Sequence, residues 1–212
     1  PSFSLKKIEE LFYKYVPEEE KDCDDPLMQP EGVEQFLRDI GLDPEDVAVI
    51  VLSWHFKAST MCYYKKSEFT RGMVELQVDN VEKLREKIPT LRTELQDRSK
   101  FKEIFEFTFS WSREQDKKFL DVETAVGMLE LLLPDQLPLS SPLLSFLKVQ
   151  TSYPVINKDQ WISTLEFVEA TDDSLSNYNE SESWPVIFDE FVKWVKEKNP
   201  EKYSAGVAES DF

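Results

Sequence analysis

The chain has 212 residues, 41% of them hydrophobic and 13% aromatic, which is enough to bury the core of one larger domain or of two small ones. Its 42 Asp and Glu against 25 Lys and Arg give a formal charge of −17, which opposes nucleic acid and anionic membranes and favours basic protein partners. No apolar run of about 18 residues and no signal-peptide pattern occur, so we expect no membrane segment. Cys23 and Cys62 lack metal or redox spacing and indicate reduced thiols in a cytosolic or nuclear protein.

Apolar residues recur at spacings of three and four, which predicts an all-α protein with few strands. Helices are expected over residues 4–15, 30–42, 43–56, 79–95, 99–111, 120–133, 140–150, 157–168 and 183–195. Gly41 is the expected stop of one helix, and Asp43 the expected N-cap of the next. The run Val47–Leu52 is apolar on all sides, so its helix should be buried. Asn157 and Gln160 predict a capping box.

Three loops separate these helices, and a tail follows them. The loops are the acidic stretch 17–30, the Pro-rich stretch 133–142 and the stretch 171–183, whose composition favours turns. Residues 197–212 are expected to form a flexible C-terminal tail.

A weak internal repeat refines this organisation. Residues 42–52 followed by 64–76 resemble residues 120–132 followed by 156–168. The comparison pairs Lys66 with Lys158, Phe69 with Trp161, and Met73 with Leu165. Each unit then consists of a helix, a loop with a short extended pair, and a second helix, which is the plan of an EF-hand.

Calcium binding is the obvious hypothesis for such a plan, and the loops argue against it. A calcium loop needs acids or amides at its positions 1, 3 and 5, Gly at 6 and Glu at 12. Counting from Asp22 places Pro26 at position 5, Leu27 at 6 and Val33 at 12, and the loop 113–124 fails in the same way. We expect no metal.

Enzyme chemistry finds little support. His55 is the single histidine, and we expect it to be a packed side chain rather than a general base. The chain has five glycines and no phosphate-binding Gly motif. Cys62 is the one candidate nucleophile, but no His lies near it in sequence, so a buried thiol acting as a small hydrophobe is preferred. No catalytic residue and no cofactor are expected.

Charge is segregated near the C-terminus. Between Asp159 and Val192 there are nine acids and no Lys, Arg or His. A helix beginning near Ser183 would place Trp184, Phe188, Phe191 and Val195 on its inward face, with Asp189 and Glu190 outside. Aromatic residues would then hold the segment on the core while its acids face outward. On charge alone, a solvated face and a docking surface both remain open.

Several stretches carry a resemblance to a known family: "LSNYNESESWPVIFDEFVKW", "NKDQWISTLEF", "LDPEDVAVIVLSWHFKASTMCYYKKSEFTRGM" and "FKEIFEFTFSW". They resemble the potentiating-neddylation domain of the DCN1-like (defective in cullin neddylation) family, from about Leu5 to Val195. The resemblance implies an all-α domain over residues 1–196, with two calcium-free, EF-hand-like lobes at about 1–98 and 99–196. It also implies a noncatalytic scaffold-type co-ligase that brings a cullin and the modifier-charged E2 together.

Two surfaces follow from the resemblance. The family's cullin-binding Asp, Ala, Asp trio falls on Asp159, Ser183 and Asp189, with Ser in place of Ala. The positions matching its pocket for the acetylated N-terminal methionine of the E2 are Pro30, Val33, Val49, Ile50, Leu52, Met61, Cys62, Tyr64, Trp111, Met128 and Leu131. Met61 and Tyr64 replace the Gln and Phe that are common in relatives, so pocket shape and E2 preference are expected to differ.

The implied partners are the C-terminal winged-helix region of a cullin, the acetylated neddylation E2 and, indirectly, a RING protein. The protein is expected to act as a monomer. The alternative from another class is a helical protein-interaction module with an acidic docking face and no E2 partner. An enzyme that uses Cys62 ranks third.

Overall fold

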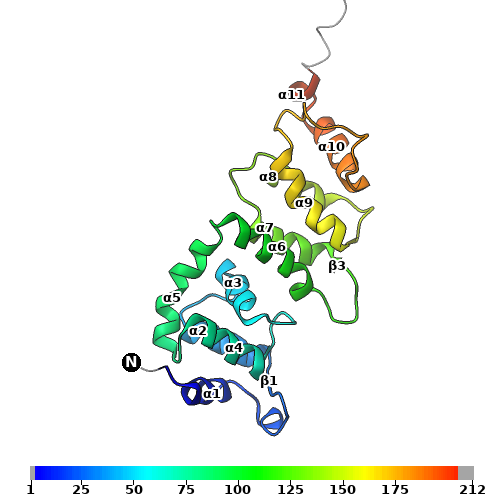
Figure 1. Ribbon diagram of the computed structural model, residues 1–212. Coiled ribbons are helices and arrows are strands. Elements are labelled where there is room, and N and C mark those ends of the chain that lie inside the picture. Colours follow the sequence, from blue (N-terminus) through cyan, green and yellow to red (C-terminus); the bar gives the residue numbers. More distant parts are fainter. Residues whose placement is uncertain (1–2, 205–212) are drawn as a thin grey trace, which may run out of the picture. The chain divides into compact units, whose positions relative to one another are not determined.

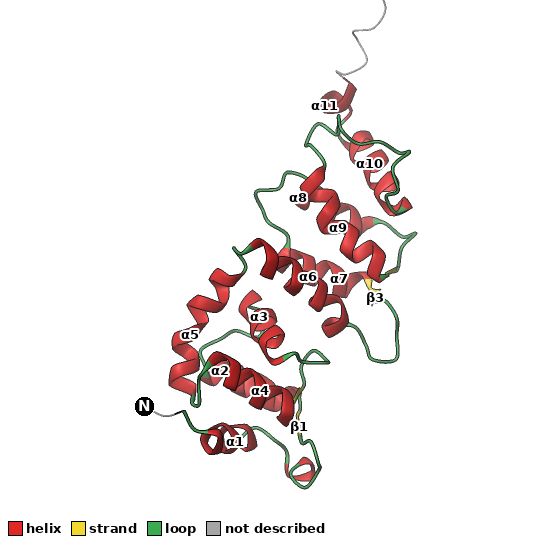
Figure 2. Cartoon of the chain, in the orientation of Figure 1, coloured by secondary structure: helices red, strands yellow, loops and turns green. Residues whose placement is uncertain are grey.

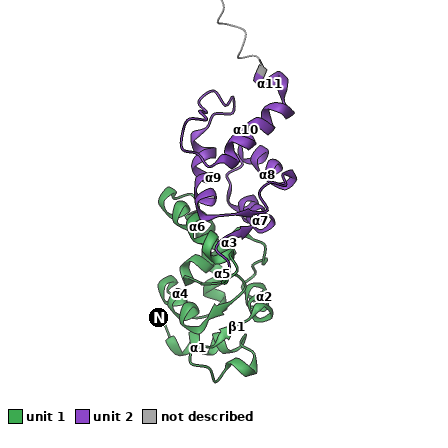
Figure 3. Ribbon diagram, turned by 90° about the vertical axis from the view of Figure 1, so that its right-hand side faces the viewer, with its two compact units in different colours: residues 1–116 green, residues 117–212 purple. Residues whose placement is uncertain are grey.

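The computed structural model describes residues 3–204. Over these residues the chain is all-α apart from two small two-stranded sheets (Figure 1, Figure 2), which confirms the expected fold class. It divides into two compact units, residues 1–116 and 117–212 (Figure 3). Helix α6 (Arg98–Ser112) lies in the first unit, where it packs against α3 (Val47–Phe56). The two expected lobes, at about 1–98 and 99–196, stay a prediction.

The first unit is built from helices around one short antiparallel strand pair. Its elements are α1 (Leu5–Tyr13), η1 (Glu18–Glu20), β1 (Leu27–Met28), α2 (Pro30–Asp39), α3, β2 (Tyr64–Lys65), α4 (Lys66–Leu76), α5 (Val81–Glu94) and α6. Strand β1 pairs with β2, with Leu27 opposite Lys65 and Met28 opposite Tyr64. Helix α3 packs against α4 and α5, and α1 packs against α4.

Gly41 ends α2 as predicted. It adopts a left-handed conformation, with φ 77°, and its N–H donates to the carbonyl of Arg38 at 2.9 Å. The N–H of Leu42 donates to the carbonyl of Leu37 at 2.8 Å, which completes a Schellman motif. Because glycine has no Cβ, this conformation costs it little.

The prediction that Asp43 caps the next helix is wrong. Helix α3 begins at Val47, and Asp46 is its N-cap, since its carboxylate accepts from the N–H of Ala48 at 2.8 Å. Asp43 instead accepts from the N–H of Glu45 at 2.8 Å, within the turn that precedes the helix. The helix itself is buried from Ala48 to Ser53, as its apolar run predicts.

Phe69 is the centre of the aromatic core of the first unit. It is fully buried, and its ring lies 5.4 Å from each of the rings of Phe12, Phe36 and Phe56. Helix α4 approaches Phe56 at Gly72, where a Cβ would come within 1.9 Å of the Phe56 ring. Only glycine therefore permits this approach of α4 to α3.

The second unit repeats the strand-and-helix plan. Its elements are β3 (Leu120–Asp121), α7 (Val122–Leu132), α8 (Ser140–Val149), β4 (Val155–Ile156), α9 (Lys158–Ala170), α10 (Val186–Lys198) and α11 (Pro200–Ser204). Strand β3 pairs with β4 in antiparallel register. Helix α8 packs against α7 and α10. The predicted capping box at the start of α9 is confirmed, with Asn157 and Gln160 exchanging hydrogen bonds of 2.8 and 2.9 Å.

Helix α10 does not begin near Ser183 as expected. It begins at Val186 and has Pro185 at its N-cap, because a proline disfavours the helical conformation in the residue before it, here Trp184. Phe188, Phe191 and Val195 are buried as predicted. The helix continues to Lys198, and α11 follows, so part of the predicted tail at 197–212 is helical. The rest of that tail, residues 205–212, lies outside the described residues.

The repeat agrees with the structure in one half only. In both units a strand leads into a helix, β2 into α4 and β4 into α9, and the paired residues Phe69 and Trp161 are both fully buried. The other half pairs α3 with α7, but α7 directly follows a strand and α3 follows a turn. The Leu-Asp motif shared by residues 42–43 and 120–121 therefore occupies different local structures. The EF-hand likeness stays a prediction. No helix within residues 3–204 combines the length and the apolar character needed to span a bilayer.

Candidate protein-docking surfaces

Asn177 anchors the start of the acidic loop, residues 171–183, at the end of α9. The Asn177 Nδ2 donates to the carbonyl of Ala170, the last residue of α9, at 2.7 Å, and its Oδ1 accepts from the N–H of Asp172 at 2.8 Å. Further along, Leu175 is buried although its φ is 58°. A left-handed conformation is unfavourable for leucine, and burial of the side chain offsets that cost. The loop therefore has defined anchor points on its unit.

Aromatic packing supports the loop and the start of α10. Phe167 of α9 is fully buried and is the centre of this cluster. Its ring centroid lies 4.6 Å from Phe188 in a stacked arrangement, 5.5 Å from Trp184, 5.8 Å from Phe191 and 6.0 Å from Tyr178. The aromatic residues of the segment thus pack on Phe167, and Asp189 and Glu190 remain at least partly exposed.

Tyr178 connects this cluster to the predicted cullin-binding carboxylate. Its hydroxyl donates a hydrogen bond to Oδ1 of Asp189 while its ring rests edge-on against Phe167. A phenol is a neutral donor, so it orients the carboxylate without cancelling the charge. A carboxylate accepts about four hydrogen bonds, which leaves positions for a cation. Spacing alone does not identify Asn177 or Tyr178 as positioning residues; the signal was the Ser-Asn-Tyr motif itself.

Asp189 also lines a surface depression of about 420 Å³ along α10. Its lining residues are Glu180, Asp189, Glu190, Val192, Lys193, Lys196 and Glu197, so four carboxylates face two ammonium groups. The depression thus brings Glu180 of the acidic loop together with Asp189 and Glu190 of α10. Asp159, exposed in the first turn of α9, and Ser183, exposed before Pro185, are not among its lining residues. That these two join Asp189 in one patch stays a prediction.

Other acids of the segment have internal partners and are not equivalent to Asp189. Asp173 pairs with Lys202 of α11 at 2.7 Å, so its charge is matched within the chain. Glu182 accepts from the indole N–H of Trp184 at 3.1 Å. Glu190 accepts from the hydroxyl of Tyr153 at 3.1 Å, and desolvation together with this carboxylate raises the pKa of Tyr153. The Ser183 hydroxyl does not cap α10, whose N-cap is Pro185.

The residues of the predicted E2 pocket have mixed exposure. In the first unit the buried ones are Val33, Val49, Ile50, Leu52, Tyr64 and Trp111, whereas Met61 is half-buried and Pro30 and Cys62 are exposed. In the second unit Met128 is half-buried and Leu131 is exposed. Tyr64 is held in the core, because its hydroxyl bonds to that of Ser53 at 2.7 Å and its ring packs edge-on against Phe56.

The turn at residues 59–65 carries Met61 and Cys62 and is held from two sides. Glu68, a buried acid of α4, accepts from the backbone N–H groups of Ser59 and Lys65, each at 2.9 Å, and from the Ser59 hydroxyl. The N–H of Met61 donates to the carbonyl of Trp111 in α6 at 2.8 Å. These bonds fix the backbone of the turn between α4 and the end of α6.

The environments of Cys62 and His55 do not favour nucleophilic chemistry. Cys62 is exposed, so the prediction of a buried thiol is wrong. Partial desolvation of its sulfur still raises the pKa of the thiol, which reduces the thiolate fraction at neutral pH. His55 is buried, and its ring nitrogens lie 3.1 Å from Glu75 and 2.5 Å from Glu94. It therefore joins α3 to α4 and α5, as a packed side chain would.

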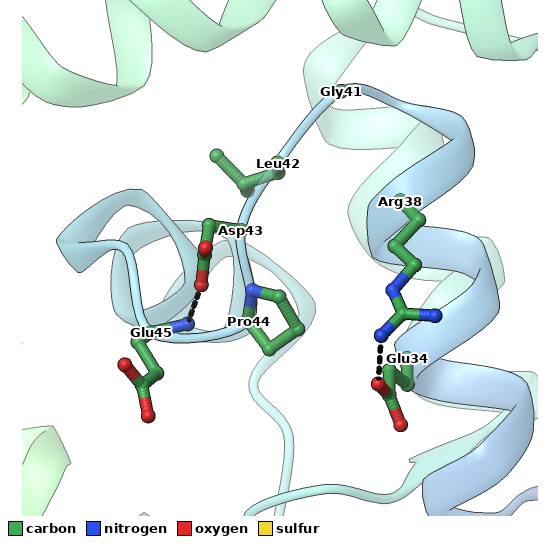
Figure 4. A pocket seen from close by; sticks show the side chains of 7 residues that line it. All are labelled: Glu34, Arg38, Gly41, Leu42, Asp43, Pro44 and Glu45. Atoms are coloured by element: carbon green, nitrogen blue, oxygen red, sulfur yellow. Dashed lines mark hydrogen bonds and ion pairs between the residues drawn. The ribbon is translucent and has the colours of Figure 1, made fainter.

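A second depression, of about 580 Å³, lies beside the turn between α2 and α3 (Figure 4). It is lined by Glu34, Arg38, Gly41, Leu42, Asp43, Pro44 and Glu45. Its guanidinium, Arg38, is already paired with Glu34 at 2.5 Å, as the dashed line in Figure 4 marks. This depression belongs to neither predicted surface. Among residues 3–204, no group of three or more His, Cys, Asp and Glu side chains is arranged to hold a metal ion.

The all-α fold and the anchored acidic loop suit a protein-docking domain, and the comparisons with known proteins point to the same class. A family model described as cullin binding matches residues 83–194, more than half of the chain. The chain is 43% identical to DCN1-like protein 5 of Homo sapiens over 92% of this chain and 79% of the relative. It is 44% identical to DCN1-like protein 4 of Danio rerio, over 93% and 68% respectively, and 36% identical to DCN1-like protein 4 of Drosophila melanogaster, over 92% and 76%.

The chain belongs to the DCN1-like family. The matched cullin-binding region runs from α5 into α10, so it contains the acidic loop, Tyr178 and Asp189. Membership supports a cullin as partner and a co-ligase role in cullin neddylation.

Proposed function

We propose that this protein is a noncatalytic scaffold that promotes transfer of a ubiquitin-like modifier from its E2 to a cullin lysine. The observation that carries the proposal is the way in which neighbouring residues orient the Asp189 carboxylate. This carboxylate is oriented by the neutral hydroxyl of Tyr178, whose ring packs on the buried Phe167. An oriented carboxylate with its charge intact suits a Lys or Arg of a protein partner.

The acidic surface, meaning Asp159, Ser183 and Asp189 with the neighbouring Glu180, is the proposed docking site for the winged-helix region of the cullin. Asp159, Ser183 and Asp189 would contact the cullin, and Glu180 adds charge beside Asp189. Truncating one partner of a desolvated charge pair costs about 2 kcal/mol or more, because the other charge remains buried without a partner. Asp189 should therefore matter more than Asp173, whose charge Lys202 already matches.

The second proposed site receives the acetylated N-terminal methionine of the E2, with the RING protein joined only through the cullin. Acetylation suits an apolar pocket, since a free ammonium group is costly to desolvate whereas an amide needs only hydrogen bonds. The scaffold would act as a monomer, in the cytosol or nucleus. Both cysteines are free, which is in keeping with a reducing compartment.

A noncatalytic role makes a specific prediction for Cys62. Because partial desolvation of its sulfur raises the pKa of its thiol, Cys62 is poorly suited to carry the modifier as a thioester. The variant Cys62→Ser should still accelerate transfer to the cullin, measured as the rate of modified cullin formed in a reconstituted reaction. A modifier thioester trapped on Cys62 would contradict the scaffold role.

One observation favours the alternative, a helical interaction module without an E2 partner. Ile50, Leu52 and Tyr64 are closed inside the core of the first unit, which is also what ordinary core residues would do. The test is calorimetry with purified cullin C-terminal domain and with acetylated and free N-terminal E2 peptides. The scaffold binds both the cullin and the acetylated peptide, and prefers that peptide over the free one by at least about tenfold, or 1.4 kcal/mol. The alternative module binds the cullin and neither peptide.

A further inference from the structure

Trp111 carries a buried hydrogen-bond donor without a partner. It lies in the last turn of α6, its side chain is 4% exposed, and its indole Nε1–H is the unpaired buried side-chain atom found among residues 3–204. Buried N–H groups are nearly always paired, because an unpaired one loses the hydrogen bonds that water would supply. The indole of Trp184, in contrast, donates to Glu182. The unpaired donor of Trp111 therefore points to an acceptor that residues 3–204 do not supply.

The surroundings of Trp111 hold it in place. Its ring stacks on Phe107 with centroids 6.1 Å apart, and its carbonyl accepts from the N–H of Met61. The turn so attached to Trp111 carries Met61 and Cys62, whose sulfur atoms are weak acceptors. Cys62 has φ 70°, a left-handed conformation that the bonds to Glu68 and Trp111 maintain. Trp111 is thus held in place at the turn that carries Met61 and Cys62, two residues of the predicted E2 pocket.

We propose that Trp111 is a specificity-determining residue, whose indole N–H donates to the acetyl carbonyl of an N-acetylated methionine. This inference rests on the proposed E2 site. The chemistry that fits a lone buried donor is an uncharged acceptor, and the acetyl amide supplies one. A free N-terminus supplies an ammonium group, which has three donors and no acceptor. The indole N–H would therefore favour the acetylated peptide and oppose the free one.

The test is calorimetry of wild type and Trp111→Phe against acetylated and free N-terminal E2 peptides. Phenylalanine keeps an apolar ring and removes the donor, so binding of the acetylated peptide should weaken by about tenfold. Binding of the free peptide should change little, so that the preference for acetylation narrows. Trp54→Phe is the matched control, since Trp54 is outside both predicted surfaces, and it should bind both peptides as wild type does.

The indole NMR signal of wild type supplies a second readout that does not depend on a variant folding. The chain has five tryptophans, so the Trp111 signal can be assigned as the one lost in Trp111→Phe, or by sequential assignment if that variant unfolds. Saturation with acetylated peptide should move this signal downfield and slow its exchange with solvent. A preference for the acetylated peptide that survives undiminished in Trp111→Phe would overturn the inference and leave the proposed function standing. A Trp111 indole signal that does not move at saturation would also overturn the inference and leave the proposed function standing. Failure of wild type to bind either peptide would remove the proposed E2 site itself, and this inference with it.

Discussion

Glu68 in the first unit and Asp189 in the second are both helix carboxylates, yet the structure uses them in opposite ways. Glu68 is buried, and three donors from the 59–65 turn occupy its oxygens, so it holds the chain together. Asp189 is half-buried and receives the Tyr178 hydroxyl. A carboxylate saturated by internal donors is structural, whereas one oriented by a single neutral donor keeps its charge for a partner.

The largest effect is expected from removing the ring at the centre of an aromatic cluster, Phe167 in the second unit or Phe69 in the first. Phe167→Ala should lower the free energy of unfolding by about 3–5 kcal/mol, because it removes a fully buried ring contacted by four others. It should also weaken cullin binding, since Tyr178 and Trp184 lose their support. Denaturant unfolding and calorimetry on the folded variant measure the two effects.

Phe69→Ala is the matched control, because Phe69 is the corresponding fully buried ring of the first unit. It should cost similar stability, about 3–5 kcal/mol, and leave the cullin affinity of the folded protein unchanged. An equal loss of cullin affinity in both variants would show that the aromatic cluster around Phe167 has no special role in docking.

A smaller effect is expected at the Tyr178 hydroxyl. Tyr178→Phe keeps the ring on Phe167 and removes the hydrogen bond to Asp189, so the carboxylate gains rotational freedom. Cullin affinity should fall by about tenfold, or 1.4 kcal/mol, with the melting temperature nearly unchanged. The double variant Tyr178→Phe with Asp189→Asn tests the mechanism, since the tyrosine substitution should have no further effect once Asp189 is neutral. Additive losses would show that Tyr178 acts independently of Asp189.

The smallest effect concerns pH and the first unit. Burial acts to raise the pKa of Asp46, but the hydrogen bonds from Arg92 and the Ala48 N–H, together with the charge of Arg92, outweigh it and lower the pKa. A lowered folded pKa contributes stability above the unfolded value of about 3.9, and that stability is lost as pH falls through the folded pKa. Asn is an equally good N-cap, so Asp46→Asn isolates the charge.

At pH 7 the variant should lose about 0.5–1 kcal/mol of unfolding free energy, and the difference from wild type should shrink below about pH 4. Chemical unfolding at both pH values measures this. A difference that stays constant down to the lowest pH at which both proteins fold would contradict the proposed role of the Asp46 charge.

Sequence patterns predicted much of the fold because its signals are local. The period of apolar residues identified the helices, Gly41 marked a helix end through its freedom at positive φ, and Asn157 with Gln160 marked a helix start. The start of α3 differs from the prediction because neighbouring residues compete for the cap position, and the start of α10 differs because Pro185 disfavours a helical Trp184. Asp46 wins over Asp43 through its contact with Arg92, 46 residues away, which no local pattern contains.

The candidate sites divide in the same manner. The outward charge of Asp189 follows from its place off the apolar stripe of its helix, so the sequence sufficed. The hydrogen bonds from Tyr178 to Asp189 and from Asn177 to Ala170 depend on how the loop folds back on α9. The unpaired indole N–H of Trp111 depends on the packing around it. Such contacts depend on the folded arrangement of residues that are distant in sequence, so composition and spacing do not predict them.

The central claim is that the acidic surface is a docking site and not merely a solvated face. The measurement is calorimetry of the cullin C-terminal domain and of acetylated E2 peptide against wild type, Asp159→Lys and Asp189→Lys, at low and high salt. Glu123→Lys is the matched control, since it makes the same change of charge at an exposed position of α7.

Asp189→Lys should abolish detectable cullin binding, Asp159→Lys should weaken it strongly, and the control should bind nearly as wild type. Cullin affinity should fall with salt while peptide affinity hardly moves, because only the former depends on charge. The fold should persist, since substitutions at such surface positions usually change stability by about 0.5 kcal/mol or less. Unchanged cullin binding in both reversals, with unchanged melting temperatures, would contradict the account and leave the acids as a solvated face.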